Sequence, residues 1–294
     1  MKTNADARDR LLAQMPVTER RLELAGVSTP VLEGGDGPPL VLLHGPGEHA
    51  PKWLRIVPDL VETHRVIAPD LPGHGESEVL RGELDVEQVI DWLGELIERT
   101  CKTKPTIVAQ IVGGPIAARF AARHGDRIEQ LVLVDALGLA PFEPAPEFGR
   151  ALEGFYAQPT AETHDELWGQ CAHDLDRLRD GMGKHWDALA AYNLDRATTP
   201  AVMDAVGKLM AAFGFPPVDP AELERITVPT TLIWGREDLA TALGKAKAAS
   251  AAYGWPLHVI DGAADDPPIE RPEAFLEVLR SNVLAPAGMT EVLR

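Results

Sequence analysis

The chain has 294 residues, of which 45% are hydrophobic and 25% are charged, and its formal net charge is -17. This length exceeds one typical domain of about 100–200 residues, but it fits a single large α/β core that carries an insertion. The acidic excess argues against nucleic acids and anionic membrane surfaces as partners, because both bind through basic patches.

Export, metal binding and cofactor binding find no support in the motifs. The two cysteines, Cys101 and Cys171, are too few for a disulfide framework or a metal-ligand set. Residues 1–10 lack the apolar segment of a signal peptide, and no stretch approaches the roughly 18 consecutive apolar residues of a membrane-spanning helix. The chain has no Gly-x-Gly-x-x-Gly after its first strand and no Gly-Lys-Ser/Thr loop. We therefore expect a cytoplasmic protein without metal or cofactor, and we keep a homodimer open.

Strand-like and helix-like segments alternate along the chain. Short runs rich in Val, Ile and Leu indicate buried strands at residues 21–26, 40–43, 65–69, 106–109, 131–135, 230–234 and 257–260. Segments with helical periodicity lie between most of them, at residues 85–100, 114–123, 240–252 and 272–283. This alternation predicts a mostly parallel sheet with helices on both faces.

One region departs from the alternation. From about residue 138 to residue 223 the pattern is helical only, and proline-rich stretches bound it. We interpret this region as a helical cap inserted into the core. The expected domains are an N-terminal extension, a first core part, the cap and a second core part, at residues 1–20, 21–137, 138–223 and 224–294.

Several motifs occur in a specific order between about residues 40 and 275. They are His44-Gly45, RVIAPDLPGHGES at residues 65–77, the strand–turn–helix–strand segment 106–135, Trp234-Gly235-Arg236-Glu237-Asp238, and GAADDPPIERPEAF at residues 262–275. In this order they resemble the α/β-hydrolase superfamily, in its epoxide-hydrolase and esterase-like branch. The resemblance implies an α/β-hydrolase fold, with a mostly parallel, eight-stranded, doubly wound sheet and an inserted helical cap.

The resemblance also places a catalytic triad, and this chain departs from it. The nucleophile of the family's Gly-x-Ser-x-Gly turn corresponds to Ile111, whose hydrocarbon side chain cannot attack a substrate. The base corresponds to Asp265, and none of the nine histidines lies within residues 262–275. The acid position is kept, as Asp238. Because triad losses typically cost several orders of magnitude in rate, we do not expect an ordinary serine hydrolase.

The oxyanion site is also altered in the sequence. One backbone donor usually comes from the residue after His-Gly, which is Pro46, and proline has no N–H. The Val112 amide would then be the remaining donor.

Two carboxyl groups take the places of the triad acid and base. If Asp238 and Asp265 face each other beneath an apolar pocket, one holds a proton at neutral pH, and the pair can act as general acid and general base. The alternative is that Asp265 and Asp266 begin a loop, where they point to water or cap a backbone N–H before Pro267. Gln110, which precedes the turn, is a further candidate catalytic group, as a neutral donor and acceptor.

Aromatic residues are concentrated in the predicted cap. Some form its own core, and the others are expected to line a cavity for a flat or polycyclic ligand. Tyr156 and Tyr192 resemble the paired cap tyrosines of epoxide hydrolases. The predicted substrate-binding residues are Ile111, Val112, His44, Pro46, Trp53, Tyr156, Trp168, Trp186 and Tyr192.

Three functions remain open from the sequence. The first is a cofactor-independent cyclase, lyase, isomerase or carbon–carbon coupling enzyme that acts on a small hydrophobic natural-product intermediate. Superfamily members without Ser and His carry out such reactions, so this function is an analogy. The second is a catalytically silent protein that binds a small hydrophobic ligand. The third is a hydrolase that uses water activated by aspartates.

Overall fold

The computed structural model describes residues 5–284. Its strands are β1 (Thr18–Leu24), β2 (Val27–Gly34), β3 (Pro39–Leu43), β4 (Arg65–Pro69), β5 (Glu78–Val79), β6 (Thr106–Gln110), β7 (Gln130–Val134), β8 (Thr230–Gly235) and β9 (Leu257–Ile260). Eight of them follow one another across the sheet in the order β1-β2-β4-β3-β6-β7-β8-β9, and β5 pairs with β2. The pairs from β4 to β9 are parallel, and those of β1, β2 and β5 are antiparallel. The predicted α/β fold class is confirmed.

The helices of the core are α1 (Ala5–Leu12), η1 (Ala50–Arg55), α2 (Val57–Leu60), α3 (Val86–Thr100), α4 (Gly113–His124), η2 (Gly125–Arg127), α10 (Pro220–Leu223), α11 (Leu243–Tyr253), α12 (Pro267–Glu270) and α13 (Pro272–Asn282). Between β7 and the short α10 lie α5 (Pro146–Ala157), α6 (Ala161–Cys171), α7 (Leu175–Met182), α8 (Lys184–Ala197), α9 (Pro200–Leu209) and η3 (Met210–Gly214). We call α5 to α9 the cap helices.

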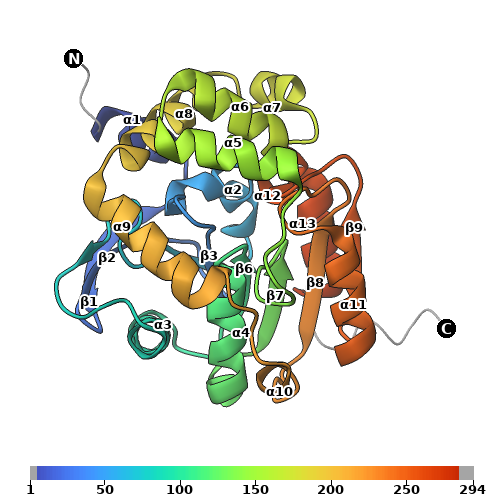
Figure 1. Ribbon diagram of the computed structural model, residues 1–294. Helices are drawn as coiled ribbons and strands as arrows, with labels where there is room; N and C mark the ends of the chain where they lie inside the picture. Colours follow the sequence, from blue (N-terminus) through green and yellow to red (C-terminus); the bar gives the residue numbers. More distant parts are fainter. Residues whose placement is uncertain (1–4, 285–294) are drawn as a thin grey trace.

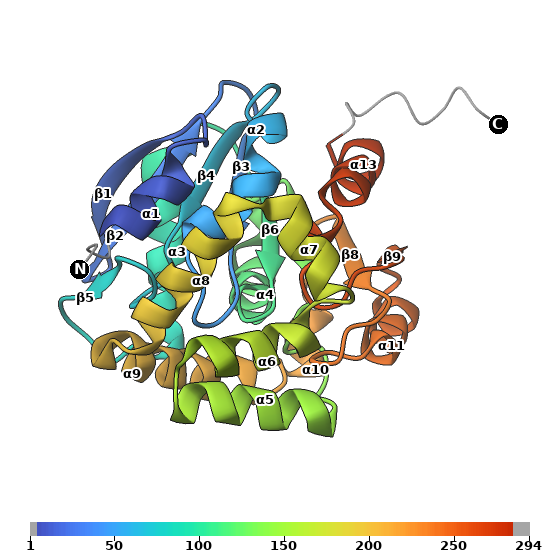
Figure 2. The same ribbon diagram turned by 90° about the horizontal axis from the view of Figure 1, so that it is seen from above.

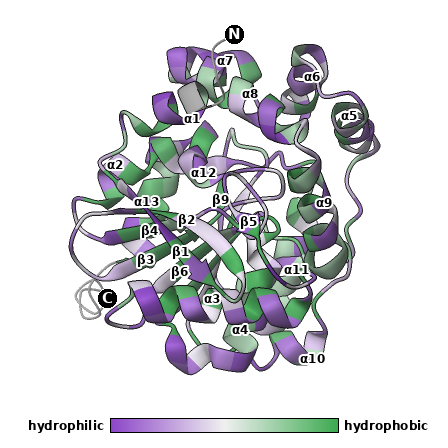
Figure 3. Ribbon diagram, turned by 90° about the vertical axis from the view of Figure 1, so that its left-hand side faces the viewer, coloured by the Kyte–Doolittle hydropathy of each residue, from purple (hydrophilic) through white to green (hydrophobic). Residues whose placement is uncertain are grey.

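Alternate residues of the strands face two separate hydrophobic cores. Val41 and Leu43 of β3 pack with α3 and α4, whereas Leu40 and Leu42 pack on the other face with α2 and α13. Side chains of a strand alternate between the two faces of a sheet, so apolar residues at every position require helices on both sides. The surrounding helices carry both hydrophobic and hydrophilic stretches (Figure 3), as expected for helices with one buried face.

Of the cap helices, α5 to α8 lie above one edge of the sheet and α9 runs in front of it (Figure 1), and α5 and α6 run side by side in the view from above (Figure 2). The loops that follow β3, β6, β7, β8 and β9 all leave the carboxyl ends of parallel strands, so they meet at one edge beneath these helices.

Residues 138–223 contain no strand, in keeping with their purely helical pattern. The domain boundaries at residues 20, 137 and 223 stay predictions. Parts of the predicted N-terminal extension and of the second core part, residues 1–4 and 285–294, lie outside the described residues. Two strands were missed by the sequence analysis, β2 with Pro30 in its middle and the two-residue β5. Proline is uncommon inside strands, and two residues carry too little periodicity to recognise.

Candidate active site

The turn between β6 and α4 is sharp and strained. Ile111 occupies it with φ 47°, in the left-handed region that a β-branched residue rarely adopts. Its carbonyl accepts hydrogen bonds from the amides of Gly114 and Leu137, at 3.1 Å each, which hold this conformation. A Cβ added at Gly114 would lie 2.5 Å from the Cβ of Ala136, so the helix can approach β7 closely because residue 114 is a glycine. The geometry of a nucleophile-bearing turn is present, but it carries a hydrocarbon.

A cavity of about 120 Å³ lies between this turn and the cap helices. Its wall is mainly apolar and aromatic, and within residues 5–284 no lysine or arginine borders it. The lining residues are Pro46, Gly47, Glu48, Ile111, Leu137, Phe142, Phe148, Leu152, Phe155, Tyr156, His164, Leu167, Trp168, Cys171, Asn193, Ala197, Val202, Met203, Met210, Ala240, Asp265 and Asp266. Such a cavity suits a largely apolar small molecule that a few polar groups orient.

Asp265 borders the cavity from the loop between β9 and α12. Its backbone N–H donates to the carbonyl of Cys171 in α6, at 3.2 Å, which fixes the loop against the cap. Burial raises the pKa of the Asp265 carboxyl well above its ordinary value, and nearby Asp238 and Asp266 raise it further. Asp265 therefore holds its proton more tightly than an exposed aspartate does, and it borders the cavity, where it is a candidate proton donor. The alternative that Asp265 points to water is excluded, because the residue is buried.

Asp238 does not border the cavity, which corrects the expected pairing at the cavity floor. Its Oδ1 accepts the amides of Ala240 at 2.7 Å and Thr241 at 2.9 Å, and the Thr241 hydroxyl donates to Oδ2. The Asp238 carboxyl also lies near the buried Asp135, which follows β7, and the two carboxyl groups interact electrostatically. Asp238 therefore raises the pKa of Asp265 electrostatically, while its own oxygens accept hydrogen bonds within the loop that carries Asp238.

A buried cluster around Lys52 was missed by the sequence analysis. The Lys52 Nζ lies 2.8 Å from Oε1 of Glu48 and 3.0 Å from Oδ2 of Asp266, and it also donates to the side-chain oxygen of Gln110. Burial lowers the pKa of Lys52, but Asp266 and Glu48 more than offset this, so the pKa lies above its usual value. The spacing of four residues between Glu48 and Lys52 was the available signal, although it also describes a solvent-exposed pair.

Gln110 belongs to this cluster and does not line the cavity, which corrects its expected catalytic role. Its Nε2 donates to the carbonyl of Asp265 at 2.9 Å and to Oδ1 of Asp266 at 3.1 Å, while its oxygen accepts from Lys52. Because the amide is engaged at both ends inside the protein, Gln110 positions the loop that carries Asp265 and does not touch a ligand.

Glu48 presents a second carboxyl group to the cavity. Its Oε2 accepts the Gly45 amide at 2.6 Å and Lys52 at 2.9 Å. Burial raises the pKa of Glu48 and the charge of Lys52 opposes that rise. The cavity is therefore bordered by two carboxyl groups, Asp265 and Glu48, whose pKa values both lie above those of exposed carboxyl groups.

The oxyanion site keeps part of its donors. Pro46 lines the cavity and has no N–H to offer. The Val112 amide, at the start of α4, donates no hydrogen bond to the described residues, although Val112 itself is not among the cavity-lining residues. Pro46 therefore contributes no donor to the cavity, and the unpaired Val112 amide belongs to a residue outside the cavity lining.

Four predicted substrate-binding residues border the cavity: Ile111, Pro46, Tyr156 and Trp168. His44, Trp53, Trp186 and Tyr192 do not, and each has another role in the packing. The His44 ring bonds the Gly45 carbonyl at 2.8 Å and the Leu71 amide at 2.9 Å, so it orders its loop. Trp53 is buried in the core below β3. Trp186 packs edge-on against Trp168, with 5.1 Å between the ring centroids.

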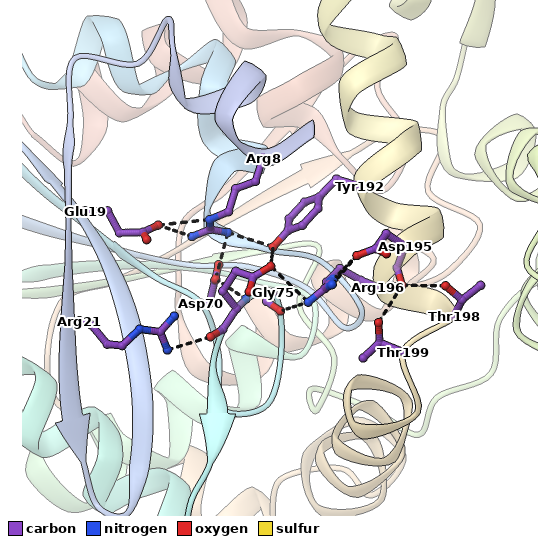
Figure 4. A network of polar contacts seen from close by, with 11 residues as sticks. Arg8, Glu19, Arg21, Asp70, Gly75, Tyr192, Asp195, Arg196, Thr198 and Thr199 are labelled. Atoms are coloured by element: carbon purple, nitrogen blue, oxygen red, sulfur yellow. Dashed lines mark hydrogen bonds and ion pairs between the residues drawn. The ribbon is translucent and has the colours of Figure 1, made fainter. Parts of the chain in front are cut away.

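Tyr192 was expected to act with Tyr156, and the structure corrects this. Its hydroxyl donates to Glu76 at 3.1 Å and accepts from Arg8 at 3.2 Å (Figure 4). Arg8 lies on α1 and also pairs with Glu19 at 2.6 Å and Asp70 at 3.1 Å. This network joins α1, the core and α8, so Tyr192 anchors the cap helix and does not reach the cavity.

The described residues offer neither a metal site nor a membrane-spanning helix. Within residues 5–284, no group of three or more His, Cys, Asp or Glu side chains could hold a metal ion. In the same part of the chain, no helix has the length and apolar character needed to cross a bilayer.

The profile of the alpha/beta hydrolase fold family matches residues 38–272, so this chain belongs to that family. The match spans the strained turn at Ile111, the Lys52 cluster, the cap helices and Asp265. The family is enzymatic, and most of its members are hydrolases.

Individual relatives differ in their named activities. A magnesium-chelatase 30 kDa subunit from Rhodobacter capsulatus is 31% identical over 209 residues, which cover 70% of this chain and 72% of that protein. A pimeloyl-[acyl-carrier protein] methyl ester esterase from Aeromonas hydrophila is 28% identical over 268 residues, 86% of this chain and 98% of that protein. Among solved structures, 2-hydroxy-6-oxo-6-phenylhexa-2,4-dienoate hydrolase from Rhodococcus sp. strain RHA1 matches with a TM-score of 0.79 and 26% identity, covering 92% of this chain and 99% of that chain.

Proposed function

We propose that this chain is a cofactor-independent, non-hydrolytic enzyme that moves protons on a hydrophobic, aromatic or polycyclic molecule. The reaction is of the cyclase, lyase, isomerase or carbon–carbon coupling type. The observation that carries the proposal is the buried Asp265 carboxyl, which borders an apolar cavity with its pKa raised well above the ordinary value. A carboxyl group that stays protonated at neutral pH is a general acid.

Glu48 is the partner base in this proposal. It borders the same cavity as Asp265, and its pairing with Lys52 keeps it ionised while burial makes it more basic. With an enolisable ketone, Asp265 donates a proton to the carbonyl oxygen while Glu48 removes a proton from the α-carbon. A C–H bond breaks, an O–H bond forms, and the double bond moves into the enol. Reversal with a solvent-derived proton restores the ketone and both carboxyl groups.

The apolar wall supports this proton transfer in two ways. It excludes water, so the charges of the transition state interact with fixed protein groups. It also holds a flat substrate in one orientation, which can supply several kcal/mol of the barrier reduction, at most about 7–11 kcal/mol for well-oriented reactants.

The experiment follows the methyl protons of 2-acetylnaphthalene by NMR in heavy water. We expect the wild type to accelerate exchange of these protons for deuterium, and both Asp265→Asn and Glu48→Gln to lose about 10²-fold or more of that acceleration, the usual range for general acid–base catalysis. Asp187→Asn, a matched change at an exposed position of α8, should leave the rate unchanged.

This exchange experiment and an assay of ester cleavage together separate the alternatives. A catalytically silent binding protein, which the hydrocarbon at position 111 also favours, would broaden the ligand signals without any exchange. A hydrolase that uses activated water would cleave p-nitrophenyl butyrate and place heavy oxygen from labelled water in the product. Either result, without exchange that depends on Asp265, would refute the proposal.

A further inference from the structure

Asn193 is a polar side chain in the otherwise apolar part of the cavity wall. It lies on α8, one residue after Tyr192, which the Arg8 network ties to α1 and to the core. Arg196, three residues further along α8, donates to the carbonyl of Gly75 at 3.0 Å. The helix is therefore anchored to the core on both sides of Asn193, which fixes the backbone position of this residue (Figure 4 shows these anchors).

Two buried histidines hold the Asn193 amide. Its Oδ1 lies 3.2 Å from Nε2 of His49, and its Nδ2 lies 3.3 Å from Nε2 of His164. Burial lowers the pKa of His49 well below its ordinary value and that of His164 to about 4, so both rings are neutral. A neutral imidazole can donate through one nitrogen and accept through the other, which satisfies one N–H and one lone pair of the amide.

One N–H of the Asn193 amide has no partner in the described part of the chain. A primary amide has two N–H groups, and the one bond through Nδ2 uses one of them. Asn193 is half-buried and borders the cavity. An oriented, unpaired donor in an apolar cavity favours a ligand that brings an oxygen acceptor, because leaving the donor unpaired has a cost.

The charges around the cavity limit the ligand further. No cationic side chain borders the cavity within residues 5–284, so a carboxylate would lose its hydration without a partner. The ammonium of Lys52 already lies between the carboxylates of Glu48 and Asp266 and offsets part of their charge, so a ligand ammonium group would gain less from them than from unpaired carboxylates.

We propose that Asn193 is a specificity-determining residue, and that the substrate is an uncharged, largely apolar molecule whose carbonyl, ether or hydroxyl oxygen accepts a hydrogen bond from the Asn193 amide. This inference rests on the proposed function only in calling the ligand a substrate. The binding of the ligand by Asn193 can be tested without turnover. His49 and His164 are positioning residues for that amide.

The test compares three probes of one shape, namely 2-acetylnaphthalene, 2-ethylnaphthalene and 2-naphthoate, by quenching of tryptophan fluorescence with calorimetry as confirmation. We expect wild type to bind the ketone about threefold to tenfold more tightly than the hydrocarbon, which is the net effect of one neutral hydrogen bond. The carboxylate should bind more weakly than both. In a further titration, 2-naphthylmethylamine should also bind more weakly than the ketone.

Two variants show whether Asn193 is the cause. Asn193→Leu removes this donor, and we expect the ketone to lose most of its advantage over the hydrocarbon, whose own affinity stays unchanged. Asn193→Asp keeps the shape and the contact with His49 but removes the N–H, so it should lower the preference for the ketone to the same extent even if Asn193→Leu fails to fold. Asp187→Asn on the same helix is the control.

The outcomes distinguish this inference from the proposed function. An unchanged ketone preference in Asn193→Asp, equal binding of ketone and hydrocarbon by wild type, or tighter binding of the carboxylate or the amine overturns the inference. If the preference depends on Asn193 but deuterium exchange does not depend on Asp265, the inference about the ligand stands and the proposed function fails. If no probe binds, both fail.

Discussion

The Nζ of Lys52 lies 3.0 Å from Oδ2 of Asp266, and the two side chains are 2% and 3% exposed. Removing one partner from a buried ion pair leaves an uncompensated charge, which costs about 3–5 kcal/mol. We therefore expect Lys52→Met to lower the free energy of unfolding by about that amount in urea denaturation. Lys102→Met, at an exposed position, should change it by less than about 0.5 kcal/mol. Equal free energies of unfolding for the two variants would contradict this prediction, because they would mean that removing Lys52 leaves no uncompensated charge on Asp266.

The pair Asp135 and Asp238 gives a prediction about pH. Burial raises the pKa of Asp135 well above its ordinary value, and Asp238 raises it further. The folded state then keeps a proton that the unfolded state loses above about pH 3.9, so the free energy of unfolding falls as the pH rises from there to the folded-state pKa. Asp135→Asn keeps an oxygen for the Gly235 amide, which lies 2.8 Å from Oδ1, and removes the titrating group.

We expect this substitution to stabilise the protein more at about pH 8 than at about pH 5, with a slope of at most about 1.4 kcal/mol per pH unit. Urea midpoints across this range measure the effect. A stability difference that is independent of pH, like the one expected for Asp187→Asn, would mean that Asp135 is ionised in the folded state.

The positive φ of Ile111 predicts that glycine is more stable than alanine at this position, the reverse of the usual order in a helix. Alanine in the left-handed region costs about 1–2 kcal/mol, whereas glycine adopts it freely. Ile111→Gly should therefore be more stable than Ile111→Ala by about 1 kcal/mol. At Ala117, inside α4, glycine should be less stable than alanine by about 0.5–1 kcal/mol. The same order at both positions would contradict the strained turn.

Restoring the missing triad tests where residues 111 and 265 lie. The double variant Ile111→Ser with Asp265→His should gain hydrolysis of p-nitrophenyl butyrate, since Asp238 is retained beside position 265. Ile111→Ser alone should stay inactive, because it lacks a base. Adding Pro46→Gly supplies a second oxyanion donor, and we expect a further gain of up to about 10²-fold. A folded but inactive double variant would mean that residue 265 does not reach residue 111.

The fold was readable from the sequence because its signals are local. Apolar runs such as those of β3 and β6 are flanked by turn residues and helical periodicity, and the order of the elements defines a parallel sheet. The absence of a nucleophile at Ile111 is also a local fact, since the glycines beside it identify the turn whatever side chain it carries.

The partners of the polar groups were decided by the tertiary structure alone. Lys52 and Asp266 are far apart in the chain, and their approach depends on how η1 and α12 pack at the same edge of the sheet. Gln110 and Asp238 were expected in the cavity, but their side chains form hydrogen bonds with neighbouring loops, which local sequence does not reveal.

The sequence by itself thus determined the architecture and the family, because these follow from residue types at fixed spacings. The structure determined that Asp265 and Glu48 border the cavity, that Asn193 is held by His49 and His164, and that Tyr192 is turned toward Arg8. The physical reason is that burial and hydrogen-bond partners set the charge of a carboxyl group and the direction of an amide, and both are properties of packed elements, not of local sequence.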